Sequence, residues 1–99
     1  MLNIEKTRQD DALTLTLTGR LDTATAPELE TVLRTGLEGV RSLLLDFTGL
    51  DYISSAGLRV LLGAQKVMNR QGEMKLRGVN ETITEIFDIT GFTDILTIE

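Results

Sequence analysis

The chain has 99 residues, of which 41% are hydrophobic, and this length and composition suit one globular domain. Ten basic and fifteen acidic residues leave a net charge of −5. Because the basic residues are scattered, we expect neither nucleic acid nor an anionic membrane surface as a partner. Cysteine and histidine are absent, which excludes disulfides and thiolate metal sites and removes the usual general base of enzymes.

The first two predicted elements are strands that form an antiparallel hairpin. Residues 2–8 and 12–19 flank the short polar connection Gln9-Asp10-Asp11. In the second strand, leucine and threonine alternate from Leu13 to Thr18, which is the period of a strand with one buried face. The short connection favours antiparallel pairing.

A helix is predicted to begin after Thr25. This threonine is placed to cap the helix, Glu28 completes a capping box, and Pro27 is tolerated in the first turn. Small and apolar residues recur at helical spacing and predict one buried face, formed by Ala26, Leu29, Val32, Leu33, Gly36 and Leu37.

The middle of the chain predicts a buried strand, a loop and a second helix. Residues 43–47 are almost continuously apolar, as expected of a central strand that helices cover. A loop through Gly49 and Asp51 should lead to a helix over residues 56–70 that ends near Gly72.

Projection of this second helix at about 100° per residue separates two sides. The buried side is predicted to carry Val60, Leu61, Ala64, Val67 and Met68, and the other side Arg59, Lys66 and Arg70. Leu58 and Leu62 fall away from the buried centre, so we expect them to form an apolar surface for a partner.

The last third of the chain predicts a strand, a helix and a short strand. Residues 73–77 form the strand, Asn80 caps a helix that carries Ile83, Ile86 and Phe87, and Gly91 stops it. Residues 95–98 form the last strand. The order of elements predicts an α/β fold, in which a mixed, mostly parallel sheet starts with an antiparallel hairpin and helices pack against it.

The turn before the second helix has the most informative chemistry. One interpretation is that Ser54 or Ser55 is only a helix cap, because a serine hydroxyl satisfies a free amide of the first turn. A phosphate at the same place would be favoured by those amides and by the helix dipole. It would also bring a charge of roughly −1.5 to −2 close to Asp51 and the Asp22 loop, which is a means of expelling a docked partner.

Two chemical alternatives are disfavoured. Ser55 lacks a histidine base and the glycine two positions earlier that a nucleophile elbow uses. Asp46 and Asp51 are better suited to cap loop amides than to hold a metal, since no third ligand is evident. We therefore expect no catalytic residues, no metal and no cofactor.

Several segments together resemble the STAS family, named for sulphate transporters and anti-sigma factor antagonists, over essentially the full chain. They are Gly19-Arg20-Leu21-Asp22 with Thr25, then Leu45-Asp46-Phe47-Thr48, then Tyr52-Ile53-Ser54-Ser55-Ala56-Gly57-Leu58 with Gly63, and finally Ile86-Phe87-Asp88-Ile89-Thr90-Gly91-Phe92. The resemblance implies one STAS domain over residues 1–99.

The resemblance also implies a function. A free-standing member of this family binds an anti-sigma factor that is also a serine kinase, phosphorylation of the antagonist ends the interaction, and a serine phosphatase restores it. The acceptor lies two residues before the motif glycine, which here is Ser55 before Gly57. Many members have aspartate before the acceptor where this chain has Ser54, so Ser54 is a possible second acceptor.

The partner-binding residues expected from the resemblance and the helix projection are Asp22, Thr25, Ser54, Gly57, Leu58, Arg59 and Leu62. Apolar stretches are too short to cross a bilayer and the N-terminus lacks a signal core, so we expect a cytoplasmic regulator that is not an enzyme. Two alternatives stay open, namely an unphosphorylated STAS subunit of a lipid-transport ATPase and a nucleotide-binding sensor.

Overall fold

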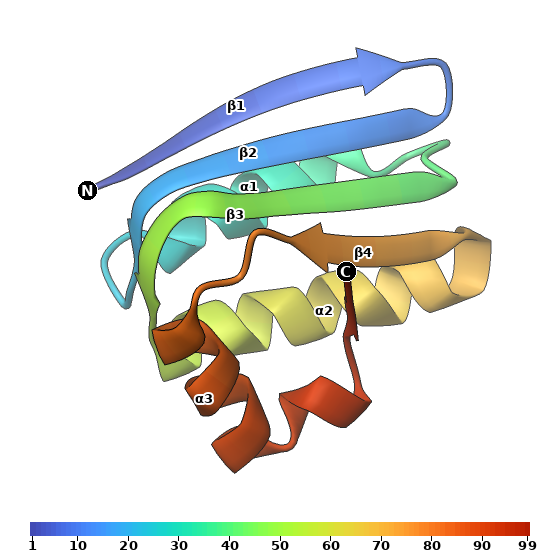
Figure 1. The fold of residues 1–99 in the computed structure, drawn as a ribbon. Helices are drawn as coiled ribbons and strands as arrows, with labels where there is room; N and C mark the ends of the chain where they lie inside the picture. The colour runs from blue at the N-terminus through green and yellow to red at the C-terminus, as the bar shows by residue number, and fades with distance from the viewer.

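The fold is a five-stranded sheet with three α-helices (Figure 1), described over residues 1–99 by a computed structural model. The strands lie in the order β1-β2-β3-β4-β5; β1 and β2 pair antiparallel, and every other pair is parallel. This confirms the predicted α/β fold and its hairpin. The elements are β1 (Leu2–Gln9), β2 (Ala12–Leu21), α1 (Ala26–Gly36), β3 (Ser42–Ile53), α2 (Ser55–Gln71), β4 (Glu73–Arg77), α3 (Glu81–Thr90), the 3-10 helix η1 (Phe92–Asp94) and β5 (Thr97–Ile98).

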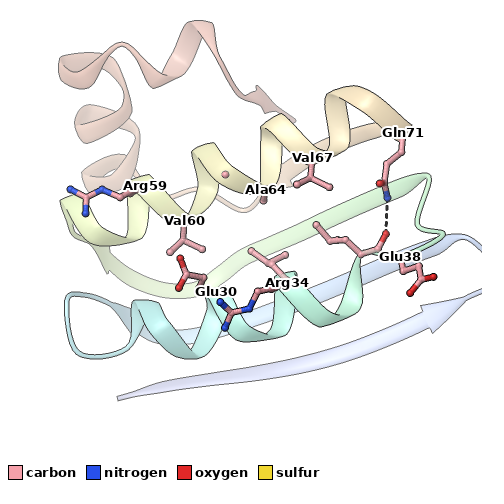
Figure 2. Close-up of a pocket in the computed structure, with 11 residues that line it drawn as sticks. Glu30, Arg34, Glu38, Arg59, Val60, Ala64, Val67 and Gln71 are labelled. Carbon is pink, nitrogen blue, oxygen red and sulfur yellow. Dashed lines mark hydrogen bonds between the residues drawn. The ribbon is translucent and has the colours of Figure 1, made fainter.

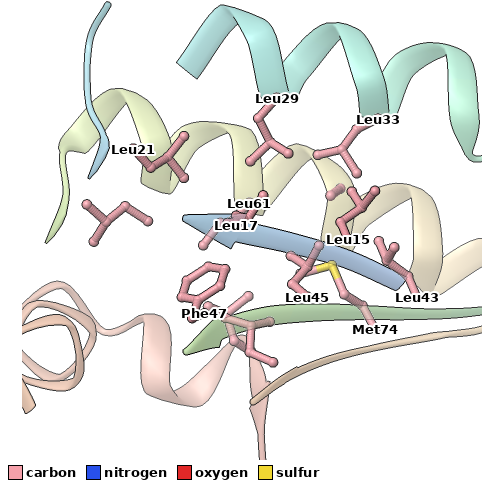
Figure 3. Packing of buried hydrophobic residues seen from close by; sticks show 14 of the residues in the cluster. Leu15, Leu17, Leu21, Leu29, Leu33, Leu43, Leu45, Phe47, Leu61 and Met74 are labelled. Carbon is pink, nitrogen blue, oxygen red and sulfur yellow. The ribbon is translucent and has the colours of Figure 1, made fainter. Parts of the chain in front are cut away.

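The core lies between the sheet and the helices α1 and α2 (Figure 3), and it also includes Ile83 and Phe87 of α3. Leu13, Leu15 and Leu17 of β2 are buried, and the threonines between them are partly exposed or exposed. Leu43, Leu45 and Phe47 of β3 are also buried. The predicted alternation in β2 is therefore confirmed, and the buried side of the sheet is the side covered by α1 and α2.

Strand β3 is longer than the predicted segment 43–47. The stretch through Gly49 and Asp51 is not a loop, because it pairs with the end of β2 after a shift in register between Thr16 and Thr18. Such an irregularity bends a strand without ending it. It leaves Leu50 and Ile53 buried, so the strand carries the chain to the start of α2.

Helix α1 starts without the predicted capping box. The Thr25 side chain makes no capping hydrogen bond to the helix, because its hydroxyl donates to the Arg20 carbonyl at 2.8 Å. The Asp22 side chain instead caps the loop that precedes the helix, since its Oδ1 accepts from Ala24 N at 3.0 Å and from Thr25 N at 3.1 Å. Pro27 lies in the first turn as expected.

Helix α2 buries a face that is rotated from the predicted one. Leu58 is only 6% exposed and Gln65 only 7%, whereas Val67 is 40% exposed. The prediction that Leu58 is a surface residue is therefore wrong. The Gln65 side-chain amide donates to Asn69 Oδ1 at 2.8 Å, while its buried Oε1 has no hydrogen-bond partner. Leu61, Ala64 and Met68 are buried as predicted.

The predicted boundaries of α3 are confirmed. The Asn80 side chain accepts from Ile83 N at 2.8 Å, and Gly91 ends the helix with a φ of +80°, a left-handed conformation that favours glycine. The last strand is shorter than the predicted segment 95–98, since η1 and the turn after it occupy the chain up to Leu96.

We expect Gly57→Ala to destabilise the protein by about 1–3 kcal/mol, the usual cost of overpacking a core. A Cβ at residue 57 would lie 2.8 Å from both Ile53 Cγ1 and Leu21 Cγ. Urea denaturation of the variant measures the change. Gly63→Ala is the matched control, because a Cβ at residue 63 meets no atom within 4 Å; equal stability of both variants would contradict this packing.

We expect Asp22→Ala to lower the urea midpoint near pH 7, because Ala24 N loses its side-chain acceptor and Thr25 N keeps only the backbone carbonyl of residue 22 at 3.2 Å. The backbone hydrogen bond from Thr25 is the main cause that holds the pKa of Asp22 below its ordinary value of 3.8. A depressed pKa stabilises the fold above the ordinary value, and this contribution is lost as pH falls through the folded-state pKa. The difference between wild type and Asp22→Ala should therefore shrink toward pH 3, and a difference that grew there would contradict the assignment.

Candidate functional site

The candidate site lies where β2 and β3 end side by side. The two strands are parallel, and Leu21 pairs with Ile53. The Asp22 loop leaves β2 directly after this pair, and Ser54 leaves β3 at the same level. The Ser54 amide donates to the Leu21 carbonyl at 2.9 Å, which joins the two segments. The predicted neighbourhood of the Asp22 loop and the Ser55 turn is therefore present in the fold, at the carboxyl edge of the sheet.

The two serines have different roles in this turn. Ser54 is the N-cap of α2, has extended backbone angles and accepts from Gly57 N at 3.4 Å with its side chain. Ser55 is the first residue of the helix and is exposed, and no protein group engages its hydroxyl. The sequence did not decide which of the two serines caps α2, and the structure shows that it is Ser54. Ser55 presents a free hydroxyl at a helix N-terminus.

Asp22 and Thr25 hold the neighbouring loop in shape. The Thr25 hydroxyl lies 3.2 Å from Asp22 Oδ1 and accepts from the Asp22 amide at 2.9 Å. Thr25 is only 5% exposed, so it supports the loop from inside and offers a partner little surface. Asp22 is half-buried, and the hydrogen bonds that lower its pKa keep it ionised at neutral pH.

Arg20 and Tyr52 also lie at this edge, and no role was predicted for their side chains from the sequence. The Arg20 guanidinium stands 4.7 Å above the centre of the Tyr52 ring, and its Nε is 3.9 Å from Asp22 Oδ2. Arg20 and Tyr52 are register partners on β2 and β3. The one sequence feature that could have indicated a role is their position just before the Asp22 loop and the serine turn. A cation over a ring in this arrangement contributes about 0.5–1 kcal/mol at an exposed site.

The remaining predicted partner residues divide into buried and exposed ones. Gly57 is buried and allows α2 to pack closely against the strand ends, and Leu58 belongs to the core. Arg59 is exposed and Leu62 is half-buried. We group the residues at this edge that are at least partly accessible, namely Arg20, Asp22, Tyr52, Ser55, Arg59 and Leu62, as the Ser55 surface.

Asp46 lies apart from the Ser55 surface and is fully engaged. Its Oδ1 accepts from the Thr48 hydroxyl at 2.6 Å and from the Thr48 amide at 3.0 Å, and its Oδ2 lies 3.1 Å from Arg77. The hydrogen bond from the Thr48 hydroxyl is the largest cause that lowers the pKa of Asp46. Asp46 therefore binds a backbone amide as predicted, but this amide lies within β3 and not in a loop. No group of three or more acidic side chains is arranged to hold a metal ion.

None of the helices is long and apolar enough to cross a membrane.

Comparison with known proteins places this geometry in a family. The family model of the STAS domain matches residues 3–99. The anti-sigma-B factor antagonist of Staphylococcus aureus strain NCTC 8325 is 36% identical over 97 residues, with 96% of this chain and 90% of that protein covered.

Solved structures agree on the fold. An anti-sigma factor antagonist from Mycobacterium paratuberculosis superposes with a TM-score of 0.88 at 16% identity and covers 99% of this chain and 85% of its own. The phosphorylated form of the Bacillus cell fate determinant SpoIIAA superposes with a TM-score of 0.75 at 18% identity, over 100% of this chain and 91% of its own. The match of the family model over residues 3–99 and the relative at 36% identity agree with the fold, and the chain belongs to the STAS domain family.

Proposed function

We propose that this chain is an anti-sigma factor antagonist that phosphorylation of Ser55 switches off. The observation that carries the proposal is the free hydroxyl of Ser55 at the first residue of α2, beside the Asp22 loop. Relatives that match nearly the whole chain at 36% identity are anti-sigma-B factor antagonists, which supports the same activity here.

The unphosphorylated chain would bind its partner through the Ser55 surface. This surface joins two strand ends and the first turns of α2 into one continuous edge, held by the Ser54–Leu21 hydrogen bond. Its charges are mixed, since it carries Arg20 and Arg59 as well as Asp22, so it suits a protein partner that offers both signs. The anti-sigma factor, itself a serine kinase, would place its active site over Ser55 in the same complex.

A phosphate on Ser55 would act through charge. It adds roughly −1.5 to −2 at pH 7 at an edge where Asp22 is ionised and Asp51 is exposed. Each pair of like unit charges about 4 Å apart costs about 4 kcal/mol at an effective dielectric near 20. The amides at the start of α2 would accommodate the phosphate locally. The fold would therefore persist while a partner with acidic groups at this edge is released, and a serine phosphatase would restore binding.

Ser54 is the weaker acceptor. Its side chain already accepts from Gly57 N and it is half-buried, so phosphorylation there would disturb the helix cap. The chain is a substrate of the kinase in this scheme and not a catalyst, and we place it in the cytoplasm with its partners.

We expect transfer of one phosphate to Ser55 when the chain is incubated with ATP and the anti-sigma factor kinase of its source organism. Peptide mapping by mass spectrometry locates the phosphate. Ser55→Ala should abolish labelling, and Ser54→Ala should keep it while losing about 1 kcal/mol of stability with the cap. Label retained in Ser55→Ala and lost in Ser54→Ala would move the switch to Ser54. If no such kinase labels the chain, that result would instead favour the alternative of an unphosphorylated STAS subunit of a lipid-transport ATPase.

We expect Ser55→Asp to weaken binding to the purified anti-sigma factor at least tenfold, because it places a charge on the Ser55 surface. Calorimetric titration measures the affinity. Thr7→Asp on β1 is the matched control, since it adds the same charge to an exposed side chain away from the helices. Unchanged affinity of Ser55→Asp, or an equal loss in both variants, would contradict release by local charge.

A further inference from the structure

A groove runs between α1 and α2 on the outer side of the helix layer (Figure 2). Its volume is about 430 Å³. Apolar side chains from both helices form its floor, namely Leu33, Leu37, Val60, Ala64 and Val67, and polar side chains surround them, namely Glu30, Arg34, Glu38, Arg59 and Gln71. An apolar floor inside a polar rim is the usual composition of a binding groove.

The groove is open because small side chains line α2 at its centre. Gly63 is exposed, and a Cβ built on it would have no atom within 4 Å. Val67, one turn further, is 40% exposed, which makes it one of four exposed large hydrophobic residues in the chain. The rotation of α2 that buries Leu58 turns Val60 and Val67 toward the groove. The apolar floor is therefore a consequence of how α2 packs.

Basic residues follow the solvent side of α2 beside the groove, and of these Arg59 also lines the groove. Arg59, Lys66 and Arg70 are exposed and share one side of the helix at about 100° per residue. The ion pairs of the fold are Arg20–Asp22 and Arg77–Asp46, so none of these three cations holds a carboxylate. In a chain with a net charge of −5, three unpaired cations in a row favour an occupant with acidic residues on that side.

The groove is also continuous with the Ser55 surface. Arg59 belongs to both, and it follows Ser55 by four residues, which is one turn of α2. From Arg59 to Gln71 the groove runs for about 18 Å along the helix axis, at about 1.5 Å per residue. This is the length of three turns, over which an amphipathic helix presents apolar residues at positions i, i+3, i+4 and i+7.

We infer that this groove receives an amphipathic helix of the anti-sigma factor, with its apolar face on the groove floor and acidic residues toward Arg59, Lys66 and Arg70. The inference rests on the proposed function. The groove would give the partner a second contact besides the Ser55 surface. The acidic residues of the bound helix would be the groups that a phosphate on Ser55 repels. Because Ser55 lies one turn before Arg59, the phosphate would meet the acidic side of the bound helix.

Substitution of Gly63 tests the groove without touching the Ser55 surface. Gly63→Leu should fill the groove and weaken binding to the purified anti-sigma factor of the source organism at least tenfold in calorimetric titrations. Thr31→Leu is the control, because it adds a leucine to an exposed position of α1 outside the groove, and its affinity should stay within threefold of wild type. Circular dichroism checks that both variants fold.

Charge reversal supplies a second measurement. Lys66→Glu should weaken binding at least fivefold, whereas Lys75→Glu on β4, where the flanking Met74 and Leu76 are the buried residues of the strand, should not. Loss of affinity in Ser55→Asp together with wild-type affinity in Gly63→Leu overturns the groove and leaves the proposed function standing. Wild-type affinity in both, or no binding by the unmodified chain, overturns the proposed function and the groove with it. A loss in Gly63→Leu without a loss in Lys66→Glu overturns the acidic side of the occupant.

Discussion

The parallel pairing of Leu21 with Ile53 is the constraint on which the site depends. It ends two strands at the same level, so the Asp22 loop and the serine turn start from adjacent points. The hydrogen bond from Ser54 N to the Leu21 carbonyl and the close approach of Gly57 to both strand ends then fix the first turn of α2 over this edge. Without a small residue at position 57, α2 would be pushed away from the strands and Ser55 would move with it.

The same packing separates structural and accessible residues within a short motif. Ser54 is used as the helix cap, Gly57 as the point of contact and Leu58 as part of the core. Ser55 and Arg59 are exposed between and after them. The segment from Ser54 to Arg59 therefore presents one free hydroxyl, that of Ser55, and its neighbours hold this residue in place. A phosphate there changes the charge of the edge without removing a contact that the fold needs.

Local chemistry explains which features could be predicted from the sequence. The Asn80 cap, the Gly91 stop and the leucine–threonine alternation of β2 depend on nearest neighbours, and all three were confirmed. The extension of β3 through Gly49 depends on pairing with β2, which a reading of that segment alone cannot show. The Thr25 capping box failed for a similar reason, since the hydroxyl finds the Arg20 carbonyl and Asp22 instead.

The face of α2 shows the limit of hydrophobic periodicity. Val67 is more apolar than Gln65, so the pattern favours burial of Val67. The structure buries Gln65, whose side-chain amide is bonded to Asn69, and leaves Val67 in the groove beside α1. That groove depends on the spacing of two helices and could not be foreseen from either helix alone.

In the proposed switch, charge on Ser55 releases the partner while the fold persists. It is tested most directly by titrating the anti-sigma factor with fully Ser55-phosphorylated chain at low and high salt. We expect at least tenfold weaker binding at low salt, a smaller loss of affinity at high salt because the repulsion is screened, and an unchanged circular dichroism spectrum. Equal affinity of the phosphorylated and unphosphorylated chains at low salt would contradict it.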